Sequence, residues 1–238
     1  MSMGTEIGMD VGKARLKVGV ILAGCGVYDG AEIQEAVLTL LAISRAGAEA
    51  VCLAPNVAQA HVVNHLTGKV AEGETRNVLV EAARIARGEV TDLAGFDPAP
   101  LDALVLPGGF GAAKNLCDFA FRGADCSVDP EVSRVVRAVH AAGRPVGAMC
   151  IAPVVLAKLL GSEAPKVTIG TDEGTAKAIE AMGATHLACP VKETVVDEKR
   201  RVVTTPAYML AGNIAEAATG IDGFVAQVLR LAALPAGS

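Results

Sequence analysis

The stretch Arg144–Gly161, RPVGAMCIAPVVLAKLLG, decides the fold of this chain. Its first part, Pro145–Met149, is a short apolar run typical of a buried strand, and Ile151–Leu160 has the pattern of a helix that Gly161 ends. Cys150 lies between the two. The sequence therefore predicts a tight strand-to-helix turn with a cysteine at its apex.

Small residues surround this cysteine. Ala148 and Ala152 stand two positions before and after Cys150, which is the nucleophile-elbow pattern with alanines in place of glycines. The N–H groups and the positive dipole end at a helix N-terminus favour a thiolate and bound anions. The alternative is a buried structural cysteine, because free cysteine is among the most buried residues. This stretch alone leaves both interpretations open.

The same alternation of apolar strands and helices extends over most of the chain. Strands are predicted at Lys17–Ala23, Glu49–Ala54, Asp102–Leu106, Lys166–Ile169, Thr185–Pro190, Thr194–Asp197 and Arg201–Thr204, the last two as a hairpin. Helices are predicted at Ala31–Arg45, Thr75–Arg87, Pro130–Ala142, Gly174–Met182 and Asn213–Leu234. This order predicts an α/β fold with a mostly parallel sheet and helices on both faces.

Two helices have details that the structure can test. In the helix over Ala31–Arg45 we expect one buried face, formed by Ile33, Val37, Leu40, Leu41 and Ser44. The C-terminal helix contains Gly220 and Gly223, and we expect a break at one of them because an interior glycine weakens a helix.

Composition argues against nucleic-acid-binding and membrane-inserted classes of protein. The chain has 238 residues, 52% of them apolar, a net charge of −5 and no basic run, which argues against a nucleic-acid partner. No apolar run reaches the roughly 20 residues that span a bilayer, so we expect no membrane insertion. The six cysteines have no C-x-x-C spacing, and we interpret them as reduced thiols of a cytoplasmic protein.

The N-terminal segment lacks the apolar core of a signal peptide. It carries Glu6 and Asp10, which argues against a mitochondrial transit peptide. We expect residues 1–16 to form a flexible tail and residues 17–238 to form a single domain in the cytoplasm.

Three segments carry residues suited to catalysis or ligand binding just after predicted strands. In parallel sheets, ligands bind at these carboxyl ends of the strands. Glu32 and Glu35 follow the strand Lys17–Ala23, the pair Gly108–Gly109 follows Asp102–Leu106, and Cys150 follows Pro145–Met149. Paired glycines let the backbone approach a reacting group and aim N–H groups at an anion. A favourable contact with the helix dipole is a sufficient explanation for Glu32.

A metal site is not expected. His61 and His65 have i,i+4 spacing, but no third ligand or H-E-x-x-H glutamate accompanies them. We also expect no bound cofactor.

The chain resembles the DJ-one/PfpI superfamily, the class I glutamine amidotransferase-like fold, and within it the ElbB-type isoprenoid biosynthesis glyoxalases. The matching segments are GVILAGCGVYDGAEIQEAVLTLLAISRAGA (19–48), VNHLTG (63–68), ETRNVLVEAARIARG (74–88), LPGGFGAAKNL (106–116), MCIAP (149–153), TIGTD (168–172) and VVTTPAYMLAGNIAEAATGI (202–221). The resemblance implies a flavodoxin-like three-layer sandwich with a nucleophile elbow.

The resemblance also implies an active site. The nucleophile falls on Cys150, the glutamate beside it on Glu35 rather than Glu32, and the oxyanion hole on the N–H groups of Ile151 and Gly109. Asp172 and Tyr208 are further pocket candidates, which capping and packing explain equally well. Cys25 is either a resolving thiol or an ordinary loop cysteine.

Two departures exclude other activities of the superfamily. Peptidase-type members carry histidine directly after the cysteine, where this chain has Ile151, and amidotransferases carry a late His-Pro-Glu, where this chain has Thr205-Pro206-Ala207. The resemblance therefore implies a cofactor-independent glyoxalase, a lyase that converts glyoxal or methylglyoxal to a 2-hydroxy acid. It also implies a homodimer and a small aldehyde as substrate.

Two alternatives come from other classes of protein. One is a non-catalytic redox sensor or regulatory protein in which Cys150 is oxidised to sulfenic or sulfinic acid. The other is a pseudoenzyme that acts through its dimer.

Overall fold

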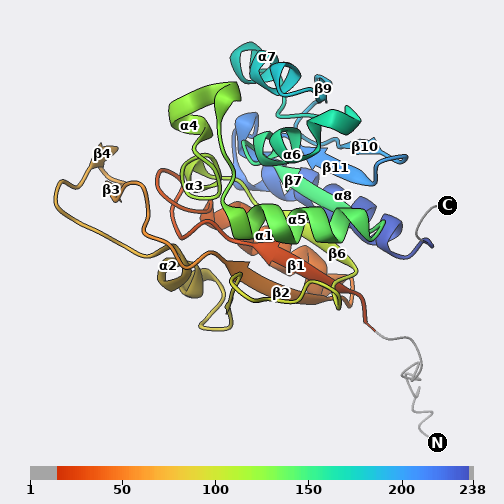
Figure 1. The fold of residues 1–238 in the computed structure, drawn as a ribbon, viewed down its shortest axis with the longest axis horizontal. Helices are drawn as coiled ribbons and strands as arrows, with labels where there is room; N and C mark the ends of the chain where they lie inside the picture. Colours follow the sequence, from red (N-terminus) through yellow and green to blue (C-terminus); the bar gives the residue numbers. More distant parts are fainter. Residues whose placement is uncertain (1–14, 236–238) are drawn as a thin grey trace, which may run out of the picture.

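The computed structural model describes residues 15–235, and one seven-stranded sheet forms its centre (Figure 1). Neighbouring strands are parallel, except that the last strand is antiparallel to the one before it. The spatial order is β5 (Thr91–Asp92), β2 (Glu49–Ala54), β1 (Lys17–Ile21), β6 (Ala103–Leu106), β7 (Val146–Met149), β11 (Val202–Thr205) and β10 (Val195–Asp197). The predicted mostly parallel sheet and the predicted hairpin are confirmed.

The central strands are apolar because both faces of the sheet are covered. Every residue of β6 and of β7 is buried, as expected for a parallel sheet between two helical layers. The buried apolar side chains form one cluster, which Phe224, Leu104 and Ile21 help to fill.

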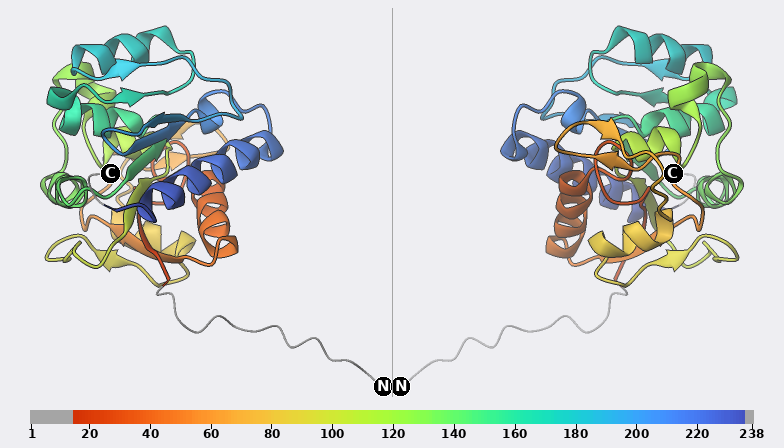
Figure 2. Two further views of the ribbon diagram at one scale, coloured as in Figure 1. Left: turned by 90° about the vertical axis from the view of Figure 1, so that its right-hand side faces the viewer. Right: turned by 90° about the vertical axis from the view of Figure 1, so that its left-hand side faces the viewer.

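Helices form a layer on each face of the sheet. α1 (Ile33–Arg45) and α8 (Ile214–Ala232) lie side by side on one face, and α5 (Pro130–Ala141) and α6 (Pro153–Leu160) lie on the other (Figure 2). The predicted three-layer sandwich is therefore confirmed. The other helices are α2 (Val78–Ile85), α3 (Phe110–Lys114), α4 (Phe119–Arg122) and α7 (Glu173–Ala181), with short 3₁₀ turns η1 (Gly123–Asp125), η2 (Gly161–Glu163) and η3 (Ala207–Met209).

Two short strand pairs lie outside the main sheet. β3 (Val63–Asn64) and β4 (Lys69–Val70) form a hairpin that projects from the body (Figure 1). β8 (Lys166–Val167) pairs with β9 (Thr185–His186), so both strands are shorter than predicted and do not join the central sheet.

The predicted buried face of α1 is wrong except at Leu40, which is partly buried and packs against the core. Ser44 is exposed. Ile33, Val37 and Leu41 are exposed by 44%, 47% and 40%. The helix instead buries a row of mostly small residues together with one carboxylate: Glu35, Ala36, Thr39, Ala42 and Ile43. Small side chains let the helix approach its neighbours closely, so packing outweighs the periodicity of the larger residues.

The C-terminal helix is continuous, so the expected break at Gly220 or Gly223 is also wrong. A Cβ atom at position 220 would lie 2.4 Å from the carbonyl oxygen of Val191. Close packing explains this glycine. No helix among residues 15–235 is long and apolar enough to cross a membrane.

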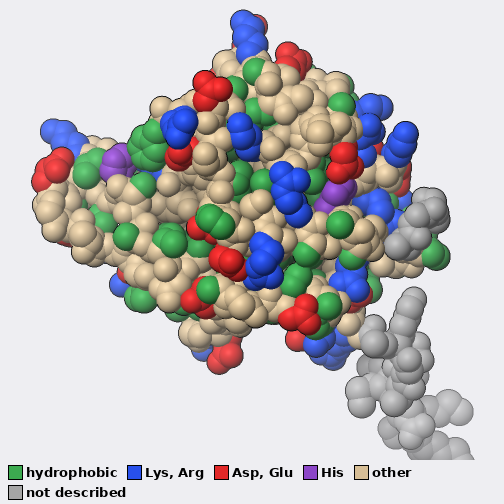
Figure 3. All heavy atoms as spheres, viewed as in Figure 1, with side chains coloured by type: hydrophobic (Ala, Val, Ile, Leu, Met, Phe, Trp, Pro, Cys, Tyr) green, Lys and Arg blue, Asp and Glu red, His purple; other side chains and the backbone are tan. Residues whose placement is uncertain are grey.

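The surface carries charges of both signs. On the face that shows α5, Lys and Arg side chains are interspersed with Asp and Glu (Figure 3). Arg134 and Glu131, for example, form an ion pair at 2.8 Å on this helix.

The predicted tail over 1–16 falls mainly on residues 1–14, outside the described residues, and the single-domain boundary stays a prediction.

Candidate active site

The topology brings three predicted segments to one edge of the sheet. β1, β6 and β7 are neighbours in the sheet, and their carboxyl ends lead toward α1, Gly108 and Cys150, respectively. The chain continues from β1 to β2 on one side, whereas β6 lies on the other side of β1, which makes this a topological switch point.

Cys150 occupies a strained turn between β7 and α6. Its φ of +58° lies in the left-handed region, which residues with a side chain seldom adopt. Ala148 and Ala152 beside it are fully buried. Such strain costs on the order of 1–3 kcal/mol and is typical of functional turns. The geometry confirms the predicted elbow, although α6 begins at Pro153 rather than at Ile151.

The thiol of Cys150 is surrounded by hydrogen-bonding groups. The backbone N–H groups of Gly109 and Ile151 donate to it, and it shares a side-chain hydrogen bond with Glu35. Cys150 is only 8% exposed, and Glu35 is fully buried. The two groups therefore form one buried acid–thiol pair.

Two backbone donors hold the carboxylate of Glu35. The N–H of Gly108 donates to its Oε2 at 2.9 Å, and the N–H of Tyr208, in η3, donates to its Oε1 at 3.0 Å. Glu32 lies one turn earlier and caps α1 by accepting the N–H of Glu35 at 2.6 Å. The structure thus assigns different roles to the two candidate glutamates, and only Glu35 contacts the thiol.

Burial dominates the electrostatics of the pair. Burial raises the pKa of Glu35 to about 7, with a smaller rise from the charge of Glu32, while the N–H groups of Tyr208 and Gly108 oppose it. Burial first, and then the charge of Glu35, raise the pKa of Cys150 well above its ordinary value of 9.0. The thiolate that we expected from the helix N-terminus is therefore not the favoured form at neutral pH.

Gly108 has no room for a side chain. A Cβ there would lie 2.4 Å from the Cβ of Cys150 and 2.7 Å from Oε2 of Glu35. Gly109 has a φ of +93°, and a Cβ there would lie 2.3 Å from the backbone nitrogen of Glu32. Glycine at both positions is thus a requirement of the site.

The remaining candidates lie in different surroundings. Asp172 is exposed and caps α7 by accepting the N–H of Thr175 at 2.8 Å. Burial, and then the charge of Glu81 in α2, raise the pKa of Cys25. Tyr208 reaches the site through its backbone N–H, while its hydroxyl donates to Gln34. Sequence reasoning missed that backbone role because any residue supplies an N–H.

The two histidines with helical spacing are engaged elsewhere. Nε2 of His65 accepts the N–H of Tyr28 at 3.3 Å, and the ring of His61 packs edge-on against Phe121. Within residues 15–235, no group of three or more His, Cys, Asp or Glu side chains is placed to hold a metal ion.

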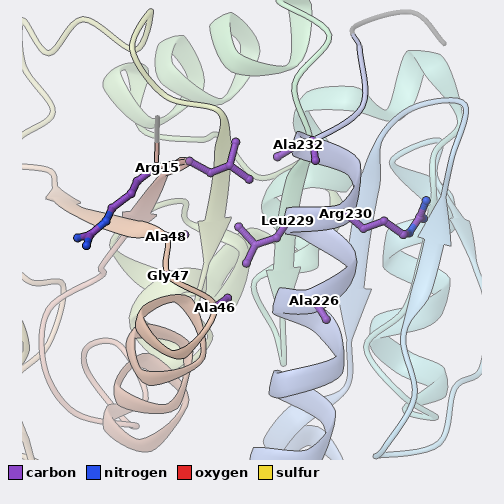
Figure 4. A pocket seen from close by; sticks show the side chains of 10 residues that line it. Arg15, Ala46, Gly47, Ala48, Ala226, Leu229, Arg230 and Ala232 are labelled. Atoms are coloured by element: carbon purple, nitrogen blue, oxygen red, sulfur yellow. The ribbon is translucent and has the colours of Figure 1, made fainter. Parts of the chain in front are cut away.

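A separate cavity of about 670 Å³ lies at the opposite, amino edge of the sheet. Figure 4 shows Leu229 of α8 pointing toward the end of α1. The residues that line this cavity include Arg15 and Arg230 but no residue with a thiol or a carboxylate. The buried pair of Cys150 and Glu35 thus lies at the other edge of the sheet from this cavity.

Comparison with known proteins agrees with this geometry. The model of the DJ-1/PfpI family matches residues 26–211. The chain belongs to the DJ-1/PfpI family. It is 48% identical over 232 residues to the human glutamine amidotransferase-like class 1 domain-containing protein 3, mitochondrial, with 94% of this chain and 86% of the human protein covered. It is 35% identical to the zebrafish ES1 protein, mitochondrial, with 81% and 76% covered.

Solved structures of the family share the fold. An isoprenoid biosynthesis protein with an amidotransferase-like domain from Ehrlichia chaffeensis has a TM-score of 0.83 at 40% identity, with 90% of this chain and 99% of that chain covered. Glyoxalase III from Candida albicans has a TM-score of 0.59 at 15% identity, with 90% and 97% covered, which shows the fold alone. The flavodoxin-like assignment is confirmed.

The expected cytoplasmic location is wrong. The relatives from human, rat and zebrafish are all named as mitochondrial proteins. The expectation rested on the reduced cysteines and on the acidic residues Glu6 and Asp10, which we interpreted as evidence against a mitochondrial transit peptide.

Proposed function

We propose that this member of the DJ-1/PfpI family is a cofactor-independent glyoxalase that converts glyoxal to glycolate through a covalent intermediate on Cys150. Methylglyoxal is the related substrate. The observation that carries the proposal is the hydrogen bond between the Cys150 thiol and a buried Glu35 whose pKa, raised by burial, is about 7. A carboxyl group with this pKa accepts and returns a proton near neutral pH.

The first step is addition of the thiol to the aldehyde. Glu35 takes the proton from Cys150 as the sulfur attacks one carbonyl carbon, which forms a C–S bond and leaves an alkoxide. That proton then passes to the alkoxide oxygen, and the product is a hemithioacetal. The high pKa of Cys150, caused by its burial and by Glu35, requires this transfer to accompany the attack.

The second step moves a proton between the two carbons. Glu35 removes the hydrogen of the carbon bound to sulfur, which gives an enediolate, and returns that proton to the neighbouring carbon, while the hydroxyl proton on the first carbon passes to the oxygen of the second. The result is a thioester of a 2-hydroxy acid. Water then breaks the C–S bond, which releases glycolate and restores the thiol. The whole reaction consumes one glyoxal and one water and needs no redox partner.

Two backbone N–H donors stabilise the negative charge that develops on the substrate oxygen. The N–H groups of Gly109 and Ile151 already face the sulfur, and an oxygen on the carbon bonded to that sulfur lies within their reach. Removal of one such donor commonly lowers kcat by about 100-fold or more.

A redox sensor is the second candidate. The donors around Cys150 that we assign to an oxyanion also suit the oxygens of a sulfenic or sulfinic acid. The raised pKa of Cys150, caused mainly by burial, argues against it, because peroxide attacks the thiolate.

One experiment separates the two candidates. Purified protein is assayed for glyoxal loss and glycolate formation by chromatography, and in parallel for peroxide modification of Cys150 by mass spectrometry. The glyoxalase predicts turnover that Cys150→Ala abolishes and that Cys52→Ala, a buried cysteine of β2, retains. Absence of turnover together with rapid oxidation of Cys150 supports the sensor.

We also propose a homodimer. The exposed apolar stripe of Ile33, Val37 and Leu41 on α1 has the character of an interface. Light scattering tests the proposal, since Val37→Glu should shift the mass to that of a monomer.

The Ehrlichia relative is named for isoprenoid biosynthesis, and we extend that metabolic setting to this chain as part of the proposed glyoxalase function.

A further inference from the structure

A second pair of interacting side chains lies away from Cys150. Cys117 follows α3, Cys126 follows η1, and the two thiols lie close enough to interact directly, although in the structure Cys117 donates to the carbonyl oxygen of Ala112 and Cys126 to the sulfur of Met182. The backbone holds them side by side through an antiparallel bridge between Cys117 and Val128 and a 3.1 Å hydrogen bond from the N–H of Asp118 to Ser127. The pairing is therefore built into the fold of this segment.

The two thiols have opposite electrostatic character. The hydrogen bond from Cys117, and then the cation of Lys158, lower the pKa of Cys126 to about 7, although burial and Asp118 oppose them. The same hydrogen bond and burial raise the pKa of Cys117. The pair thus combines a nucleophilic thiolate with a protonated thiol.

The segment between the cysteines is only shallowly buried, although Phe119 packs against the core and Lys158 donates to the carbonyl oxygen of Ala124 at 3.0 Å. Cys117 and Cys126 are only 4% and 2% exposed, but no residue of α4 or η1 is buried. Phe121 in α4 is 55% exposed. Segments with few buried contacts open locally far more often than the core does, so a small oxidant reaches the pair without global unfolding.

We propose that Cys117 and Cys126 are a reversible dithiol–disulfide site, oxidised by a peroxide and independent of Cys150. The Cys126 thiolate attacks one peroxide oxygen, the O–O bond breaks, and Cys126 becomes a sulfenic acid as the first water leaves. The sulfur of Cys117 then attacks that of Cys126, the S–O bond breaks, the S–S bond forms, and a second water leaves. The two thiols lose two electrons and two protons, which the peroxide receives.

Oxidation would reach the active site through α3. While both thiols are protonated, the S–H of Cys117 donates to the carbonyl oxygen of Ala112 at 3.3 Å, and it turns to the sulfur of Cys126 when that thiol ionises. The N–H of Ala112 in turn donates to the carbonyl oxygen of Gly109 at 3.0 Å. Gly109 is one of the two donors to Cys150. Disulfide formation removes the S–H donor from this chain of contacts.

Trypsin gives a direct readout, because it places each cysteine in its own peptide. Cleavage after Lys114, Arg122 and Arg134 yields peptides 115–122 and 123–134, with one cysteine each. The full-length protein is treated with hydrogen peroxide, blocked with iodoacetamide, denatured, digested without reductant and analysed by mass spectrometry. Cys150→Ala is treated in parallel.

The proposal predicts one disulfide-linked peptide pair, lighter by two hydrogen atoms than the sum of its parts, in both wild type and Cys150→Ala. Dithiothreitol should restore both free thiols, and linking should be about tenfold or more faster at pH 8 than at pH 5. Cys117→Ser should yield Cys126 sulfinic acid in place of the link. Alkylated, unlinked peptides from peroxide-treated wild type would overturn the proposal, as would a link that requires Cys150.

Discussion

The replacement Glu35→Gln should change how the stability of the protein depends on pH. Burial raises the pKa of Glu35 from its ordinary value of 4.5 to about 7. The folded protein therefore holds this proton more tightly than the unfolded chain does. The stability that the protonated carboxyl contributes is complete below pH 4.5 and is lost as pH rises through about 7.

The magnitude follows from the pKa difference. Each pKa unit corresponds to about 1.4 kcal/mol, so ionisation of Glu35 costs the folded state about 3 kcal/mol, with most of that loss between pH 5 and pH 8. Glutamine cannot ionise. The free energy of unfolding of Glu35→Gln, relative to wild type, should therefore rise by about 2–3 kcal/mol from pH 5 to pH 8.

Urea denaturation of both proteins at a series of pH values measures this difference directly. Other titrating groups are common to both proteins and cancel to first order. Glu49→Gln is the matched control, because that carboxylate is exposed at the start of β2. If the free energies of unfolding of wild type and Glu35→Gln change with pH in parallel, the raised pKa of a buried Glu35 is refuted. The same holds if Glu49→Gln diverges from wild type as much as Glu35→Gln does.

Three further predictions follow from the same structure. Gly108→Ala should abolish turnover and cost about 1–3 kcal/mol by urea denaturation, because its Cβ would lie 2.4 Å from the Cβ of Cys150; full activity would contradict the close approach. In α8, Gly223→Ala should stabilise by about 0.5–1 kcal/mol, because nothing lies within 4 Å of its new Cβ, whereas Gly220→Ala should destabilise against Val191; equal melting shifts would be inconsistent with this packing. Glu35→Gln should slow alkylation of Cys150 at pH 7, because burial keeps the pKa of this thiol high and the variant lacks the base that takes its proton as the sulfur attacks; an unchanged or faster reaction would contradict the role of Glu35 as that base.

The sequence was sufficient for most of the central sheet. The runs at β1, β6 and β7 are continuous and apolar, and the structure places strands there within one or two residues of the predicted bounds. The elbow at Cys150 was also predictable, because the small neighbours Ala148 and Ala152 are readable in the sequence.

Other features depend on tertiary packing. The buried row of α1 contains mostly small residues, so hydrophobic periodicity selected the exposed face. Glu35 was separated from Glu32 by family resemblance, since both lie near the start of α1. The N–H of Tyr208 and the high pKa of Cys150, caused by burial and Glu35, required the three-dimensional arrangement.

The direct test of the central claim is an NMR time course of glyoxal with wild type, Cys150→Ala and Glu35→Gln at neutral pH. Our account predicts that wild type forms glycolate as glyoxal disappears and that neither variant does so, although both remain folded. No glycolate from wild type, or glycolate from Cys150→Ala at the wild-type rate, would contradict it.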